Sequence, residues 1–64
     1  MPVVSVKLGK LSTDQKKELI NLLTVATSKV TKIPEESIVT IIEEYDLSSL
    51  GVGGQTIAEK YGKE

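Results

Sequence analysis

The side chains that could perform chemistry are few, because this chain of 64 residues contains neither histidine nor cysteine. Serine and cysteine triads therefore cannot form, and we expect no metal site and no cofactor. Pro2 is the exception, because it follows Met1, and aminopeptidases generally remove a first methionine that precedes a small residue. The mature chain would then begin with a secondary amine, which can act as a base without any histidine.

Pro2 can act as a base only if its amine is neutral near neutral pH. The apolar segment that follows it, Val3-Val4-Ser5-Val6, would place its amine in a poorly hydrated environment. Loss of hydration disfavours the charged form of an amine. A neutral amine in this pH range suits general-base catalysis. The alternative is that Pro2 only begins a strand.

The other polar groups support no catalytic prediction. Glu43 and Glu44 are adjacent in a predicted strand, so they point to opposite faces and cannot act on one bond. The glycine-rich segment 51–54 lacks the spacing and the lysine of a phosphate-binding loop and predicts a turn. Tyr45 and Tyr61 could donate protons, but we expect both to pack.

The elements that position Pro2 begin with an alternating, β-branched strand from Val3 to Leu8. Ser12 and Gln15 then form a predicted capping box, which starts a helix from about Thr13 to Lys32. The apolar residues at helical spacing predict the stripe that covers a sheet; they are Leu19, Leu22, Leu23, Ala26 and Val30.

A second strand is predicted from Ser37 to Tyr45, with apolar residues on both of its faces. Strand, helix and strand form a βαβ unit of class α/β, followed by turns between Asp46 and Gln55, a terminal hairpin or arm, and a short helix at 56–61. We expect one domain over residues 1–64. One helix covers only one face of a two-stranded sheet, so the other face requires a second subunit.

The composition excludes several classes of function. The formal net charge is −1, all eight basic residues are lysine, and only two residues are aromatic. Nucleic-acid binding is therefore not expected. The chain contains no apolar run of the length that crosses a membrane and no signal-peptide pattern, so a cytoplasmic protein is expected.

Four segments, in order along nearly the whole chain, carry a family resemblance. They are Met1-Pro2-Val3-Val4, Ser12-Thr13-Asp14-Gln15-Lys16, Ile38-Val39-Thr40-Ile41-Ile42-Glu43-Glu44 and Gly51-Val52-Gly53-Gly54. Together they resemble the 4-oxalocrotonate tautomerase family. The resemblance implies βαβ protomers assembled into a homohexamer, a trimer of dimers, with the amino-terminal proline as general base and a small keto or enol acid as substrate.

The resemblance also indicates where substrate would bind. The family's two arginines correspond to Lys10-Leu11, in a connection one residue shorter, and to Val39; its aromatic residue corresponds to Leu50, and Ser37 is a polar match. The predicted substrate-binding residues are therefore Lys10, Ser37 and Leu50. Lys10 could equally be an exposed loop lysine, with backbone N–H groups near Leu8 or in a neighbouring subunit holding the oxyanion.

The predicted function is a cofactor-independent keto–enol tautomerase, similar to 2-hydroxymuconate tautomerase, that acts on a small 2-hydroxydienoate or related keto acid. Two alternatives remain open. One is another proline-based reaction, such as hydration and dehalogenation of a haloacrylate. The other is an oligomer without enzyme activity that kept the fold, which the absence of arginine favours.

Overall fold

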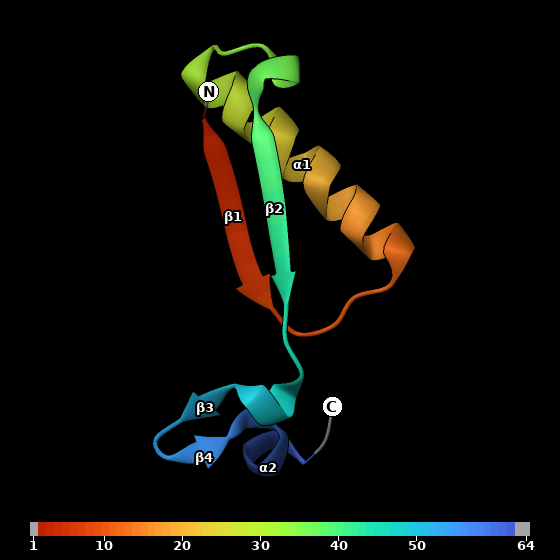
Figure 1. Cartoon of the computed structure of the whole chain (residues 1–64). Helices are drawn as coiled ribbons and strands as arrows, with labels where there is room; N and C mark the ends of the chain where they lie inside the picture. The colour runs from red at the N-terminus through yellow and green to blue at the C-terminus, as the bar shows by residue number, and fades with distance from the viewer. Residues whose placement is uncertain (1, 63–64) are drawn as a thin grey trace.

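The computed structural model describes residues 2–62 and shows a two-stranded parallel sheet crossed by one long helix, with an arm beyond one end of the sheet (Figure 1). The elements in chain order are β1 (Val3–Leu8), α1 (Thr13–Thr31), the short 3-10 turn η1 (Glu35–Ser37), β2 (Val39–Glu44), the 3-10 turn η2 (Leu47–Ser49), β3 (Gly51–Val52), β4 (Gln55–Thr56) and α2 (Ile57–Tyr61). This order confirms the predicted βαβ unit and terminal hairpin, although β2 is shorter than the predicted strand.

The sheet register explains which side chains face the helix. Val3 lies opposite Val39 and Leu8 opposite Glu44. Exposure alternates along β1, with every second side chain half-buried, as expected for a strand covered on one face. Thr40 of β2 faces the helix, because its Oγ1 lies 3.0 Å from Oγ1 of Thr24 in α1. The opposite face is open and carries the odd-numbered residues of both strands.

Both ends of α1 are capped by the sequence itself. The Ser12 hydroxyl accepts the Gln15 N–H at 3.1 Å, and the Gln15 side chain accepts the Ser12 N–H at 3.0 Å, which confirms the predicted capping box. At the other end, Lys32 adopts the left-handed conformation, with φ 65° and ψ 20°, and donates its N–H to Ser28 O at 2.8 Å. Glycine is the residue that usually occupies this position.

Replacing Lys32 by glycine is expected to raise the free energy of unfolding by up to about 1 kcal/mol, because the left-handed backbone disfavours a Cβ atom. The matched control is Lys29→Gly, which puts glycine inside the same helix and should lower that free energy by about 1 kcal/mol. Urea titration at fixed protein concentration measures both. Equal destabilisation by the two variants would contradict the strain argument.

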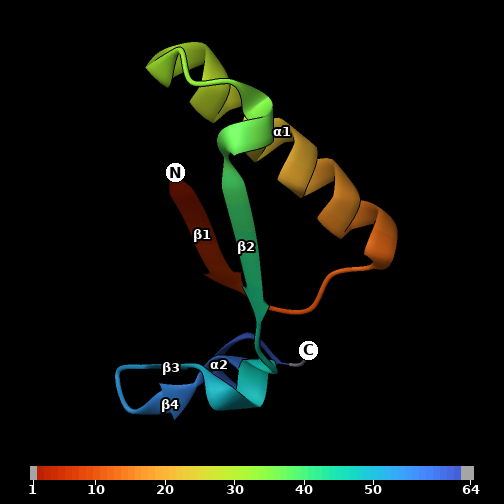
Figure 2. The same ribbon diagram turned by 45° about the horizontal axis from the view of Figure 1, so that its top comes forward.

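The prediction that an apolar stripe of α1 covers the sheet is only partly confirmed. Leu19 and Leu23 are half-buried, but Leu22 and Val30 are 56% and 81% exposed. The helix lies against β2 (Figure 2) and presents Thr24 to it, so part of the apolar stripe is left outside that contact. The leucines therefore need a cover that this protomer does not supply.

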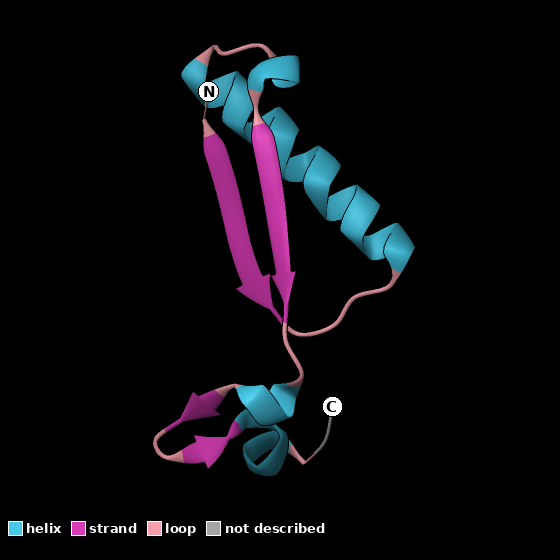
Figure 3. Ribbon diagram, viewed as in Figure 1, coloured by secondary structure: helices cyan, strands magenta, loops and turns pink. Residues whose placement is uncertain are grey.

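None of the residues 2–62 is buried. The open face of the sheet includes Val3 and Ile41, which are 56% and 42% exposed. The described chain is also elongated, 41 × 24 × 15 Å, because the arm lies beyond the sheet and does not fold back on it (Figure 3). A protomer with these exposed apolar faces has no core of its own, which supports the expectation that it associates.

The arm after β2 is a small hairpin followed by one turn of helix. Its bend is made by Gly53 and Gly54, which both have positive φ, as a two-residue hairpin turn requires. Ile57 donates its N–H to Leu50 O at 2.8 Å and so joins α2 to the beginning of the hairpin. Within residues 2–62, no helix is both long and apolar enough to cross a bilayer.

Candidate functional site

Pro2 lies half-buried at the amino end of β1. Its carbonyl oxygen accepts the N–H of Val39 at 3.0 Å, which extends the ladder between the two parallel strands by one bond. The residue is thereby fixed to the start of β2. The predicted removal of Met1 concerns a residue outside the described part of the chain.

Ser37 lies near Pro2, because both precede the paired residues Val3 and Val39 of a parallel sheet. It ends the 3-10 turn η1, donates its N–H to Pro34 O at 3.0 Å and is exposed. The structure thus places these two predicted site residues at the same end of the sheet.

Lys10 lies at the opposite end, in the connection that leaves β1. Its Nζ is 3.2 Å from Oδ1 of Asp46, and the two side chains are 66% and 56% exposed. Leu50 belongs to this end too, because it lies in the arm, where it donates its N–H to Leu47 O at 3.4 Å. Leu50 is half-buried.

The four predicted site residues therefore form two separate pairs in one chain. β1 contains six residues, which span about 20 Å at the usual rise per residue. Pro2 and Ser37 adjoin its amino end, Lys10 follows its carboxyl end, and Leu50 lies in the arm beyond that end. An extended strand separates its ends as far as the chain allows, so Pro2 and Lys10 of one protomer lie far apart although they are close in sequence.

Glu44, at the carboxyl end of β2, makes contacts that its position in the sequence did not predict. Its carboxylate accepts the Leu11 N–H at 2.8 Å and the Lys16 ammonium at 3.1 Å, with 23% of its side chain exposed. These contacts tie the end of β2 to the β1–α1 connection, which carries Lys10. The Leu11 N–H, and after it the Lys16 ammonium, lowers the pKa of Glu44 below its ordinary value of 4.5.

Glu43 points the other way, as predicted for adjacent strand residues. Its Oε2 accepts the hydroxyl of Tyr45 at 3.1 Å, and it lies opposite Lys7 in the sheet register. The two glutamates therefore serve different faces and do not form a pair for acid–base chemistry. In the described part of the chain, no cluster of three acidic side chains is arranged to hold a metal ion.

Acid should weaken the Glu44 contacts in a defined pH range. Because its pKa is lowered on folding, Glu44 stabilises the fold above pH 4.5, and this contribution is lost as the pH falls through the lower folded value. We expect Glu44→Gln to lose less stability than the wild type between neutral pH and pH 3. Urea titrations across that range measure the slope, with Glu18→Gln on α1 as the control. Parallel slopes for Glu44→Gln and the wild type would contradict the assignment.

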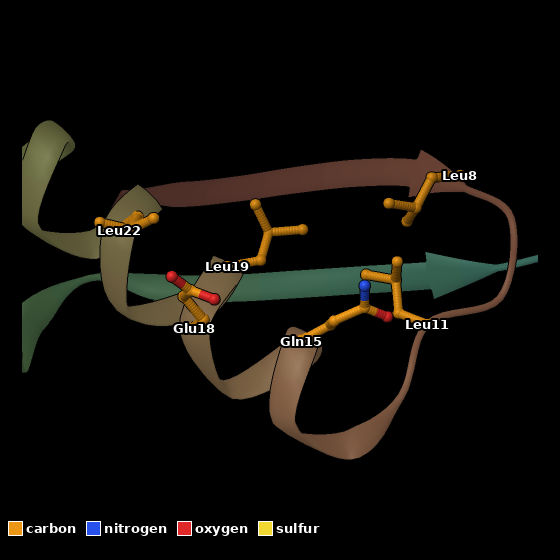
Figure 4. A pocket seen from close by; sticks show the side chains of 6 residues that line it. All are labelled: Leu8, Leu11, Gln15, Glu18, Leu19 and Leu22. Atoms are coloured by element: carbon orange, nitrogen blue, oxygen red, sulfur yellow. The ribbon is translucent and has the colours of Figure 1, made fainter.

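A hollow of about 260 Å³ lies beside β1 under the first half of α1 (Figure 4). Four leucines, Leu8, Leu11, Leu19 and Leu22, line it together with Gln15 and Glu18. It contains none of the four predicted site residues. The hollow lies between β1 and the leucines of α1 and includes the exposed Leu22, so it belongs to the surface that needs cover.

Comparison with known proteins identifies the fold and the family. The model of the family described as tautomerase enzyme matches residues 2–60. A probable tautomerase of Bacillus cereus is 43% identical over 61 residues, which cover 94% of this chain and all of that protein.

Solved structures match over nearly the whole chain. TomN, a 4-oxalocrotonate tautomerase homologue in the tomaymycin biosynthetic pathway, superposes with a TM-score of 0.90 at 28% identity, over 97% of each chain. A heterohexameric 4-oxalocrotonate tautomerase from Chloroflexus aurantiacus superposes with a TM-score of 0.80 at 30% identity, over 92% of this chain and 95% of that one.

Proposed function

This chain belongs to the tautomerase enzyme family, and on that premise we propose that it is a cofactor-independent keto–enol tautomerase with the amine of Pro2 as its general base. Its substrate is a small 2-hydroxydienoate or a related keto acid. The observation that carries the proposal is the place of Pro2 within the match to residues 2–60, at the start of an apolar strand and hydrogen-bonded to β2.

The proposed reaction moves one proton and leaves the composition of the substrate unchanged. The neutral amine of Pro2 takes the proton of the enol hydroxyl, and the resulting negative charge spreads over the conjugated carbons. The protonated amine then gives that proton to a carbon, so that a C–H bond forms and the enol becomes a ketone. A positioned base of this kind contributes about 10²–10⁴ to the rate.

The negative charge needs a cation or a donor group, and Lys10 is the proposed one. Lys10 of the same chain lies at the carboxyl end of β1, far from Pro2 at the amino end. The Lys10 that acts with a given Pro2 must therefore come from another copy of the chain. Two antiparallel copies would bring the amino end of one β1 beside the carboxyl end of the other. Leu50 would then form the pocket wall next to Lys10, while Ser37 stays with Pro2.

Self-association is therefore part of the proposed function, and a homohexamer, a trimer of dimers, is the proposed assembly. The unburied protomer, the open sheet face and the leucine-lined hollow beside β1 support it. The heterohexameric relative from Chloroflexus aurantiacus is a hexamer built from protomers of this fold. We also propose that residues 1–64 form one domain and that the protein works in the cytoplasm.

The experiment that tests the proposal follows ketonisation of 2-hydroxymuconate and of phenylenolpyruvate by absorbance. Intact-mass measurement first establishes that the sample begins with Pro2. The expected result is a rate on at least one enol far above that in buffer. A rate equal to buffer on both, with Pro2 free, would refute the enzyme and favour an oligomer that kept the fold without activity.

Mixing two defective chains tests whether each site draws on two copies. Pro2→Ala and Lys10→Ala should each have low activity alone. Chains that are unfolded together and refolded as a mixture should regain about a quarter of the wild-type sites, because random pairing supplies an intact Pro2 and an intact Lys10 that often. Refolding each variant alone is the control. A mixture no more active than the mean of the two would contradict the shared site.

A further inference from the structure

Two lysines at the carboxyl end of the sheet form ion pairs with carboxylates. Lys10 lies 3.2 Å from Asp46, and Lys16 lies 3.1 Å from Glu44. On the open face, Lys7 is opposite Glu43 in the register. The other charged residues near this end, Lys17 and Lys60 with Asp14, Glu18 and Glu59, add one more anion than cation, so within residues 2–62 this end of the sheet has no surplus of positive charge.

Apart from the exposed Ser37, the residues around the predicted base at the amino end are apolar. Val39 donates its N–H to Pro2 O and lies opposite Val3, and the half-buried Ile38 adjoins them. The charged residues that the fold brings to this end, Lys29, Lys32, Glu35 and Glu36, are all exposed and comprise two of each sign. Within residues 2–62 of its own protomer, a carboxylate placed against Val39 would lie near no lysine that an ion pair holds in place.

From these two observations we propose that the substrate is an enol acid with a single carboxylate and an apolar tail. The carboxylate binds at Lys10, and the tail, alkyl or aryl, lies against Val39 beside Pro2. The proposal rests on the proposed tautomerase function and narrows its substrate class. Asp46 and Val39 are thereby assigned as the residues that determine specificity.

Loss of hydration and the distribution of charges both disfavour binding of a substrate with a second carboxylate. A second carboxylate on the tail would lose hydration against Val39 without gaining a partner, and burial of an unpaired anion is costly. At the other end, Asp46 weakens the field of Lys10, so little attraction remains to offset that loss. The Lys10–Asp46 pair is exposed, and such pairs are weak, so one substrate carboxylate can displace Asp46 from Lys10.

The test compares kcat/KM on phenylenolpyruvate, a monocarboxylate with an aryl tail, and on 2-hydroxymuconate, a dicarboxylate. The wild type should prefer the monocarboxylate. Asp46→Asn should shift the ratio toward the dicarboxylate by about two- to fivefold, the range for an exposed pair. Val39→Lys should shift the same ratio toward the dicarboxylate by about tenfold or more, because the new lysine supplies a charged partner for the second carboxylate.

Matched controls change the same charges elsewhere. Asp14→Asn removes a carboxylate from the first turn of α1, and Asn21→Lys adds a lysine at an exposed position in the middle of that helix; neither should move the ratio. Equilibrium binding of phenylpyruvate and of cis,cis-muconate gives the same preference without turnover. A wild-type preference for the dicarboxylate, or a ratio unmoved by both Asp46→Asn and Val39→Lys, would overturn the inference. Absence of turnover with tighter binding of phenylpyruvate would refute the tautomerase and uphold the substrate class.

Discussion

Inserting one glycine between Met1 and Pro2 should lower ketonisation activity by about 100-fold or more. Removal of Met1 would then leave glycine at the terminus and bury the Pro2 nitrogen in a peptide bond. The lone pair of a peptide nitrogen is delocalised into the carbonyl group, so it is not a base. The new terminal amine would lie one residue away from the position that Pro2 occupies at the start of β1.

The comparison with Pro2→Ala separates loss of the base from loss of the fold. That variant keeps an amine at the original position, but a primary one, so we expect an activity between those of the wild type and the extended chain. Thermal unfolding should be nearly the same for all three, because the contact of this residue with β2 is made by its carbonyl oxygen. Full activity in the extended chain, with its mass confirmed, would show that another group is the base.

Replacing Ile41 by glutamate should dissociate the assembly and reduce activity by about 100-fold or more. Ile41 lies in β2 on the open face of the sheet, where 42% of it is exposed in the single protomer. A charge buried against a second apolar surface without a partner is strongly unfavourable. Since no described residue is buried within the protomer, its stability depends on that association.

Light scattering and circular dichroism measure this result, and Asn21→Glu is the matched control. Asn21 is an exposed polar residue of α1 outside the apolar stripe, so a charge there should leave both mass and activity unchanged. Ile41→Glu should appear as a monomer or an unfolded chain even though Pro2 is intact. An Ile41→Glu protein with wild-type mass and activity would contradict the role of the open face in assembly.

The local pattern of the sequence predicted the elements well. Ser12 and Gln15 identified the start of α1, the β-branched segments identified both strands, and Gly53 and Gly54 identified the hairpin turn. These features depend on hydrogen bonds and dihedral preferences between residues close in the chain, so the order of residues is enough to reveal them.

The face of α1 was harder to predict than its length. Apolar spacing suggested that Leu22 and Val30 would cover the sheet, yet both are exposed and Thr24 meets Thr40 instead. An apolar stripe shows that a surface needs cover but does not say whether its own sheet or another chain supplies it. Glu44 posed a similar problem, because its partners Leu11 and Lys16 are 33 and 28 residues away in sequence.

The sequence by itself determined the chemical repertoire of this protein: one possible amine base, lysine as its only basic side chain, and a βαβ order of elements. Only the tertiary structure decided which of those groups lie together. Parallel pairing of β1 and β2 places Pro2 with Ser37 and puts Lys10 with Asp46 at the other end of the strand. Distance along an extended strand grows with every residue, so Pro2 and Lys10 lie at opposite ends of β1 although they are close in sequence.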